Sequence, residues 1–168
     1  MNKRGYSGIE VVLVMILLFA VSFLVFSTVT AGSKAYFNLS ESQGRDADLR
    51  VGMSFLDVKL RKNDVADSVR VRANPFGEGE AVCIRSAVDG RSFDTWIYCL
   101  DGGLYELFLQ ADTAPTHDLA VRITGTDRME IRLESDGLLR IELALDDPEG
   151  GTDGIRLAGT FYLKTGVA

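Results

Sequence analysis

The chain is poor in the residues that most active sites and metal centres need. Its 168 residues include one histidine, two cysteines and one tryptophan. One histidine cannot supply a multi-histidine metal site and leaves little for a Ser-His triad, and two cysteines are too few for a disulfide scaffold. Phosphate-binding loops, dinucleotide-binding glycine motifs, HExxH and GxSxG are missing too. We therefore expect a protein that is not an enzyme, with no metal and no cofactor.

Positive charge is also in short supply. The chain has 18 lysines and arginines against 24 aspartates and glutamates, a net charge of −6 at pH 7. Two of the basic residues stand at the extreme N-terminus, so the remainder is more acidic still. An acidic surface repels phosphate backbones. We expect no direct nucleic-acid partner.

One long apolar run lies near the N-terminus. Residues 11–29 carry no charge and are numerous enough to cross a hydrocarbon core about 30 Å thick. A short basic flank precedes them, which favours a cytoplasmic N-terminus and an extracytoplasmic C-terminal part. We predict a single-pass membrane segment over about residues 9–29, in contact with membrane lipid.

One carboxylate, that of Glu10, stands at the edge of this run. A carboxylate deep in a bilayer costs about 2.5–3 kcal/mol or more. An ordinary signal peptide or membrane anchor gains nothing from it. Gly5 ends the basic flank shortly before it. A cleaved signal peptide, with a weak cleavage site at residues 30–32, and an ordinary anchor are the alternatives, but neither accounts for Gly5 and Glu10 together.

Residues 3–14, with Gly5, Tyr6 and Glu10 in order before the apolar run, resemble the class III signal of type IV pilins and pseudopilins. The resemblance implies that a prepilin peptidase cuts between Gly5 and Tyr6, and that the new N-terminal Tyr6 is N-methylated. It also implies that Glu10 guides assembly with other pilin subunits. Tyr6 stands where the family commonly has Phe, and Gly8 where it commonly has Leu.

The resemblance implies a domain organisation and a role. Residues 1–5 would be a leader peptide, residues 6–64 a long N-terminal helix and residues 65–168 an extracytoplasmic β domain. The implied protein is a minor pilin or pseudopilin of the cell membrane, assembled into a pilus or pseudopilus for competence, secretion or adhesion. A single-pass, membrane-anchored binding or sensing domain with a fortuitous N-terminal motif is the alternative.

The helix is expected to continue beyond the membrane. An apolar stripe with spacings of four, three and four predicts an amphipathic helix. The stripe consists of Leu49, Met53, Leu56 and Leu60. We expect Val51, Phe55 and Val58 to widen its buried face. A helix from about residue 9 to residue 62 would be about 80 Å long. Two separate helices with a hinge between Gly32 and Gly44 are the alternative.

After Asp64 the apolar spacing changes to strict alternation, which predicts strands, and turn residues separate the runs. The expected strands cover residues 68–72, 81–86, 93–100, 104–109, 119–124, 129–134, 138–145 and 155–163. We therefore predict an α+β fold, with the long helix packed on an antiparallel β-sheet as in pilins. The turn within residues 98–104 also resembles minor pseudopilins of Gram-positive competence systems.

One hairpin can be predicted in register. A two-residue turn would set Leu133 opposite an arginine and mix the apolar and polar faces. A three-residue loop ending at Gly137 sets Leu133 opposite Leu139, and Ile131 opposite Ile141. We predict this loop, with Gly137 in the left-handed region as part of a bulge.

Cys83 and Cys99 form a candidate disulfide, and two separate buried thiols are the alternative. A tight hairpin at Asp89-Gly90 would set Cys83 opposite residue 95 or 96. Cys99 would then lie about 10 Å further along the strand, beyond bridging distance.

The remaining candidates are weaker. His117 is expected on an exposed loop. Trp96 and Tyr98 could stack on a sugar or a base, but their strand pattern favours the core. A group of acidic residues near the C-terminus could ligate Ca²⁺, although its spacing is not that of an EF-hand, and a solvated acidic turn is the alternative. The group consists of Asp146, Asp147, Glu149 and Asp153.

Overall fold

The computed structural model describes residues 4–65, 67–134, 137–147 and 154–163. The chain divides into two compact units, Met1–Gln43 and Gly44–Ala168, and each is described by itself. The fold is α+β, as predicted. The elements are α1 (Arg4–Lys62), β1 (Val69–Ala73), β2 (Glu80–Val88), β3 (Arg91–Leu100), β4 (Gly103–Gln110), the 3-10 helix η1 (His117–Leu119), β5 (Val121–Gly125), β6 (Arg128–Glu134), β7 (Leu138–Leu145) and β8 (Ile155–Tyr162).

In the first unit, the helical segment Gly8–Ser33 exposes apolar side chains along its length. The segment Gly8–Ser33 is long and apolar enough to cross a membrane, by length and composition alone, and none of it is buried within the protein. Three of its five hydroxyls bond inside the helix: Ser22, Thr28 and Thr30 donate to the carbonyl oxygens four residues earlier, at 2.8–2.9 Å. Such internal bonds let polar side chains lie in an apolar medium.

Helical structure runs through Gly32 and Gly44 to Lys62. The predicted end near residue 62 is therefore confirmed. The division into units falls between Gln43 and Gly44, within the region where a hinge was the alternative.

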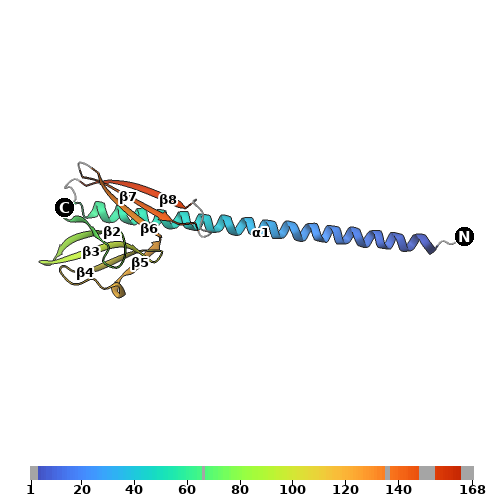
Figure 1. The fold of residues 1–168 in the computed structure, drawn as a ribbon, viewed down its shortest axis with the longest axis horizontal. Helices are drawn as coiled ribbons and strands as arrows, with labels where there is room; N and C mark the ends of the chain where they lie inside the picture. Colours follow the sequence, from blue (N-terminus) through green and yellow to red (C-terminus); the bar gives the residue numbers. More distant parts are fainter. Residues whose placement is uncertain (1–3, 66, 135–136, 148–153, 164–168) are drawn as a thin grey trace. The chain divides into compact units, whose positions relative to one another are not determined.

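The second unit holds two antiparallel sheets, whereas the sequence pattern predicted one. The first sheet has the order β1-β2-β3-β4-β5 and the second the order β6-β7-β8. All eight predicted strands are present among the described residues, and their ends differ from the predicted ones by at most two residues. Figure 1 shows the C-terminal part of α1 running between the two sheets.

The change of sheet happens at two residues. The Thr126 N–H donates to the carbonyl of Gly102, in the turn between β3 and β4 of the first sheet, at 3.2 Å. The next residue, Asp127, donates its N–H to Ala144 of β7, at 2.9 Å. Apolar alternation predicts where strands lie in the sequence but not which strands pair. The separation of β5 from β6 into different sheets could therefore not be predicted from the alternation.

The core forms where both sheets meet the helix. The predicted stripe is confirmed: Leu49, Leu56 and Leu60 are at most 1 % exposed, and Met53 packs against the same core. Gly52 lies on this face. A Cβ at Gly52 would lie 2.9 Å from Leu143 Cδ1 of β7 and 3.1 Å from Thr124 Cγ2 of β5. The glycine therefore allows the helix to approach both sheets closely.

The second set of apolar residues on the helix does not join this core, contrary to expectation. Val51 is 51 % exposed and Val58 is 59 % exposed, while Phe55 is half-buried. The reason is geometric. Val51 and Val58 are seven residues apart and therefore share one face of the helix, and the two sheets leave this face uncovered.

Two hairpins have the predicted turns. Val88 lies opposite Arg91, so Asp89-Gly90 is a two-residue turn, with φ of 50° and 75° at its two residues. In the β6–β7 hairpin Leu133 lies opposite Leu139, as predicted, and Gly137 has φ of 78°. Ser135 and Asp136 of that loop lie outside the described residues.

Candidate functional site

The N-terminal site consists of Gly5, Tyr6 and Glu10. All three lie in α1. The described side chains begin at Gly8, so those of Gly5 and Tyr6 lie outside them, as do residues 1–3 of the expected leader. Glu10 is exposed, and it is the only ionisable residue between Gly8 and Ser33.

Glu10 differs from the hydroxyl residues of this segment because it carries a charge. The hydroxyls of Ser22, Thr28 and Thr30 bond to the helix backbone. Among the described residues, the Glu10 carboxylate has neither a hydrogen bond nor an ion pair within the chain. A carboxylate in an apolar medium needs a cation or a donor to offset its desolvation. Such a partner would have to come from outside the described part of the chain.

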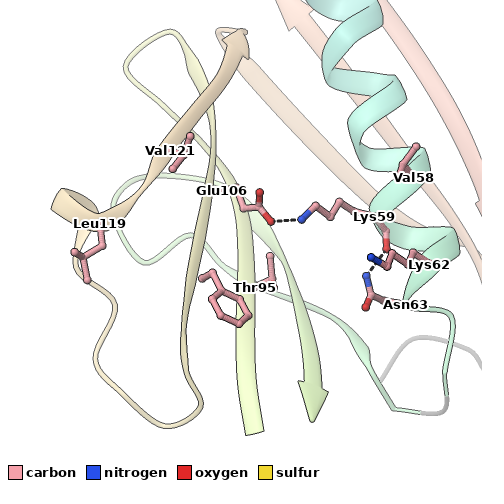
Figure 2. A pocket seen from close by; sticks show the side chains of 9 residues that line it. Val58, Lys59, Lys62, Asn63, Thr95, Glu106, Leu119 and Val121 are labelled. Carbon is pink, nitrogen blue, oxygen red and sulfur yellow. Dashed lines mark hydrogen bonds and ion pairs between the residues drawn. The ribbon is translucent and has the colours of Figure 1, made fainter. Parts of the chain in front are cut away.

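A second candidate site is a groove in the C-terminal unit, between α1 and the first sheet (Figure 2). Its volume is about 400 Å³. One wall is the last turns of α1, and the other comprises β3, β4, η1 and the start of β5. The lining residues are Val58, Lys59, Lys62, Asn63, Thr95, Glu106, Phe108, Leu119 and Val121.

The groove has an apolar rim and an ion pair across it. Lys59 Nζ lies 2.5 Å from Glu106 Oε1, and the two side chains are 32 % and 20 % exposed. Lys59 also lies over the Phe55 ring, 5.3 Å from its centroid. The pair joins the helix to β4 and neutralises both charges. Lys62, the other cation of the lining, has no ion pair among the described residues.

The outer face of the first sheet carries an ion pair between a half-buried arginine and a buried aspartate. Arg85 of β2 donates two hydrogen bonds to Asp94 of β3, at 2.7 and 2.8 Å. The hydrogen bond from Arg85 holds the pKa of Asp94 below its usual range, and the charges of Arg85, Arg72 and Arg70 add to this effect. Arg72 covers the Trp96 ring at 5.9 Å. Trp96 and Tyr98 are buried, so they form core and leave no open stacking platform.

The two cysteines are free thiols on opposite faces of the sheet. Cys83 lies opposite Trp96, as predicted for a tight hairpin, and belongs to the outer cluster with it. Cys99 packs against the inner core and donates its S–H to the Thr126 carbonyl, at 3.1 Å. Burial raises the pKa of each thiol to about 11. Cys83 and Cys99 are therefore two separate, unreactive thiols, which was the alternative to a disulfide.

His117 is not on a fully exposed loop, contrary to expectation. It lies half-buried in η1 and packs edge-on against three aromatic rings. Its Nδ1 lies 2.7 Å from the hydroxyl of Tyr98. Burial raises the pKa of Tyr98 to about 12, so the phenol stays protonated and the histidine satisfies it. His117 thus holds the loop before β5 on the outer face of the sheet.

The acidic group near the C-terminus shows no metal geometry. Glu149 and Asp153 lie outside the described residues. Within the described part of the chain, no three histidine, cysteine or acidic residues gather as metal ligands. Asp146 instead forms an ion pair with Arg128, and its N–H donates to the carboxylate of Asp127 at 2.7 Å. Its main chain also accepts a hydrogen bond from Arg45.

Reasoning from the sequence missed the groove. The sequence did hold one signal, because the helix carries two apolar rows, at Leu49–Leu60 and at Val51–Val58. A single sheet can cover only one of these rows, so the other row was a candidate for an exposed apolar surface. The wall formed by Phe108, Leu119 and Val121 gave no signal, because only the register of β4 and β5 places these residues together.

The comparisons with known proteins add one finding. No curated protein and no solved structure matches the chain. A family model described as a domain of unknown function, DUF4860, matches residues 47–146. The match spans the amphipathic part of α1 and the strands from β1 to β7, and covers more than half of the sequence. The chain therefore belongs to the DUF4860 family.

Proposed function

We propose that this protein is a minor type IV pilin or pseudopilin. A prepilin peptidase would cut between Gly5 and Tyr6, the new amine of Tyr6 would be N-methylated, and other pilin subunits would take up the processed chain. It would reside in the cell membrane as a single-pass protein with its β domain outside, and then in the filament. The proposal gives it no catalytic role and no direct nucleic-acid partner.

The observation that carries the proposal is the position of Glu10. It is the only ionisable residue in Gly8–Ser33 and has no partner among the described residues. Cleavage after Gly5 would create an ammonium group about one helical turn away, on the same subunit or a neighbour. Pairing the two charges offsets the desolvation that each would suffer alone. A subunit that docks at the correct axial level would gain this pairing.

The N-terminus of the membrane-bound protein tests the proposal directly. We expect intact mass and N-terminal sequencing to give a chain that starts at Tyr6, with one added methyl group. A chain that starts at Met1, or one that starts near Gly32, would rule out prepilin processing.

Glu10→Ala tests the assembly role. Removing the carboxylate lowers the cost of insertion and also removes the partner of the Tyr6 amine. We expect the membrane level to be kept and incorporation into sheared or crosslinked filaments to fall. Ser22→Ala is the matched control, because the Ser22 hydroxyl bonds only within its own helix. Equal incorporation of the two variants would contradict the role assigned to Glu10.

A second function is favoured by the groove beside α1. An open, partly apolar groove of about 400 Å³ suits a membrane-anchored domain that binds another protein. For a chain that only binds and does not assemble, we expect an uncut N-terminus and no dependence on Glu10. The two measurements above therefore separate the two functions.

A further inference from the structure

We propose that the groove beside α1 docks an amphipathic α-helix from another protein, and that this helix carries a carboxylate that meets Lys62. The inference goes beyond the assembly role and does not depend on cleavage at Gly5. It rests on the surface, the shape and the charge of the groove.

Four of the nine residues that line the groove are apolar and exposed. Val58, Phe108, Leu119 and Val121 are 54–69 % exposed, although the core beside them is closed. Figure 2 shows Val58 on the helix wall, and Leu119 and Val121 on the opposite wall. Contiguous exposed apolar side chains of this kind mark sites of protein contact. Binding of a partner that buries these side chains would be favourable, because it removes their apolar surface from water.

The shape favours a helix over a strand. Val58 lines the groove, and Val51 and Phe55, which lie outside the lining, precede it on α1. The spacings of four and three place the three side chains in one row, a ridge that a second helix can pack against. Strand addition is disfavoured at the other wall. β5 is a short edge strand, and its register with β4 shifts between Leu104 and Tyr105. Such a bulge twists an edge away from further pairing.

The charge defines the occupant further. Lys59 is neutralised by Glu106, at 2.5 Å, which leaves Lys62 as the cation at the end of the groove. A carboxylate on the incoming helix would complete this pair. The occupant is not expected to be a second copy of this chain. The only α-helix among the described residues is α1, which forms the groove's own wall, and the net charge of −6 makes two copies repel.

The test uses the full-length chain in the membranes of the cells that make it. A photo-crosslinking benzoyl-phenylalanine replaces Leu119 or, in a second variant, Val121. The control position is Val88 at the end of β2, which is 49 % exposed and does not line the groove. Tryptic mapping then identifies the crosslinked segment. Fluorescence of Trp96, the single tryptophan, checks that each variant is folded.

We expect adducts at Leu119 and Val121 but not at Val88. The captured segment should have apolar residues at helical spacing and an Asp or Glu beyond its end. Val58→Asp and Lys62→Glu should each reduce the yield about tenfold. Val65→Asp should leave it unchanged, because Val65 is exposed outside the groove lining. Reversing the charge of the mapped carboxylate should restore the adduct of Lys62→Glu.

Four results would overturn the inference. They are equal yields at Leu119 and Val88, capture of a strand-forming segment, capture of a second copy or of lipid alone, and a yield that Val58→Asp does not change. A yield that falls with Val58→Asp but not with Lys62→Glu would reject the carboxylate. None of these results depends on whether the chain starts at Met1 or Tyr6.

Discussion

The segment Gly8–Ser33 and the segment after Gly44 belong to one helix by hydrogen bonding, yet their side chains have different surroundings. In the first, every large apolar side chain is about half exposed or more. In the second, Leu49, Leu56 and Leu60 are buried while Val51 and Val58 are not. The difference follows from pattern. Apolar residues on all sides cannot be covered by one domain, whereas a stripe can.

The comparison shows what covers the apolar side chains of each segment. The second segment is covered inside the chain, by two sheets. The first has no such cover among the described residues, and by length and composition it could cross a membrane. The two segments of one helix are thus buried in different ways. Three sets of substitutions in α1 test this difference, and a fourth tests an ion pair in the first sheet.

The largest effect is expected from a charge placed in the buried stripe. Leu56 is 0 % exposed, so Leu56→Asp buries an unpaired carboxylate. We expect the free energy of unfolding to fall by roughly 3–5 kcal/mol, measured by denaturant titration of the full chain with Trp96 fluorescence. Val58→Asp, two residues further on the exposed side, should cost less than about 1 kcal/mol. Similar losses would mean that the helix does not pack between the sheets.

Truncation of leucines compares the two segments without adding charge. Leu60→Ala should cost about 2–5 kcal/mol, because it leaves a cavity in the core. Leu17→Ala should change the same unfolding transition by less than about 0.5 kcal/mol, since Leu17 is 58 % exposed in the first unit. A large effect of Leu17→Ala on the Trp96 signal would show that the first segment stabilises the second.

The ion pair between Arg85 and the buried Asp94 gives the second unit a pH dependence. Because its pKa is lowered in the folded state, Asp94 contributes stability above its unfolded value of about 3.9, and that stability is lost as the pH falls through the folded value. Asp94→Asn should cost about 2–3 kcal/mol at pH 7 and much less at pH 2.

Glu130→Gln is the control for this pair. Its partner Arg132 lies 3.3 Å away, and both side chains are more than half exposed. The effect of Glu130→Gln should be close to zero at either pH. An Asp94→Asn variant with the same small and pH-independent effect would contradict the assigned pair.

The smallest effects should come from two glycines of α1. Gly52→Ala gains helix propensity of about 1 kcal/mol but brings a Cβ to 2.9 Å from Leu143 Cδ1, so we expect a net loss of about 1 kcal/mol. Gly44→Ala meets no atom within 4 Å and should gain up to about 1 kcal/mol. Opposite signs in the thermal melts would confirm that only Gly52 serves close packing.

Several features could be predicted because they depend on residues close in sequence. Alternation located all eight strands, and face matching placed Leu133 opposite Leu139, because a shift by one residue would turn every side chain to the wrong face. The periodic stripe located the buried side of α1, because residues three and four apart lie on one face of a helix. The place of Glu10 at the edge of an apolar run is likewise a property of the sequence alone.

The sequence by itself therefore determined the apolar N-terminal segment, the strands, their turns and the buried stripe. Only the tertiary structure decided that β5 and β6 separate into two sheets, that Cys83 and Cys99 face opposite ways, and that His117 meets Tyr98. It also decided that Val58, Phe108 and Val121 line one groove. The physical reason is the separation in sequence between the residues that interact. Local periodicity sets which face of an element is apolar, but which apolar faces meet, and which stay uncovered, depends on packing between residues distant in the chain.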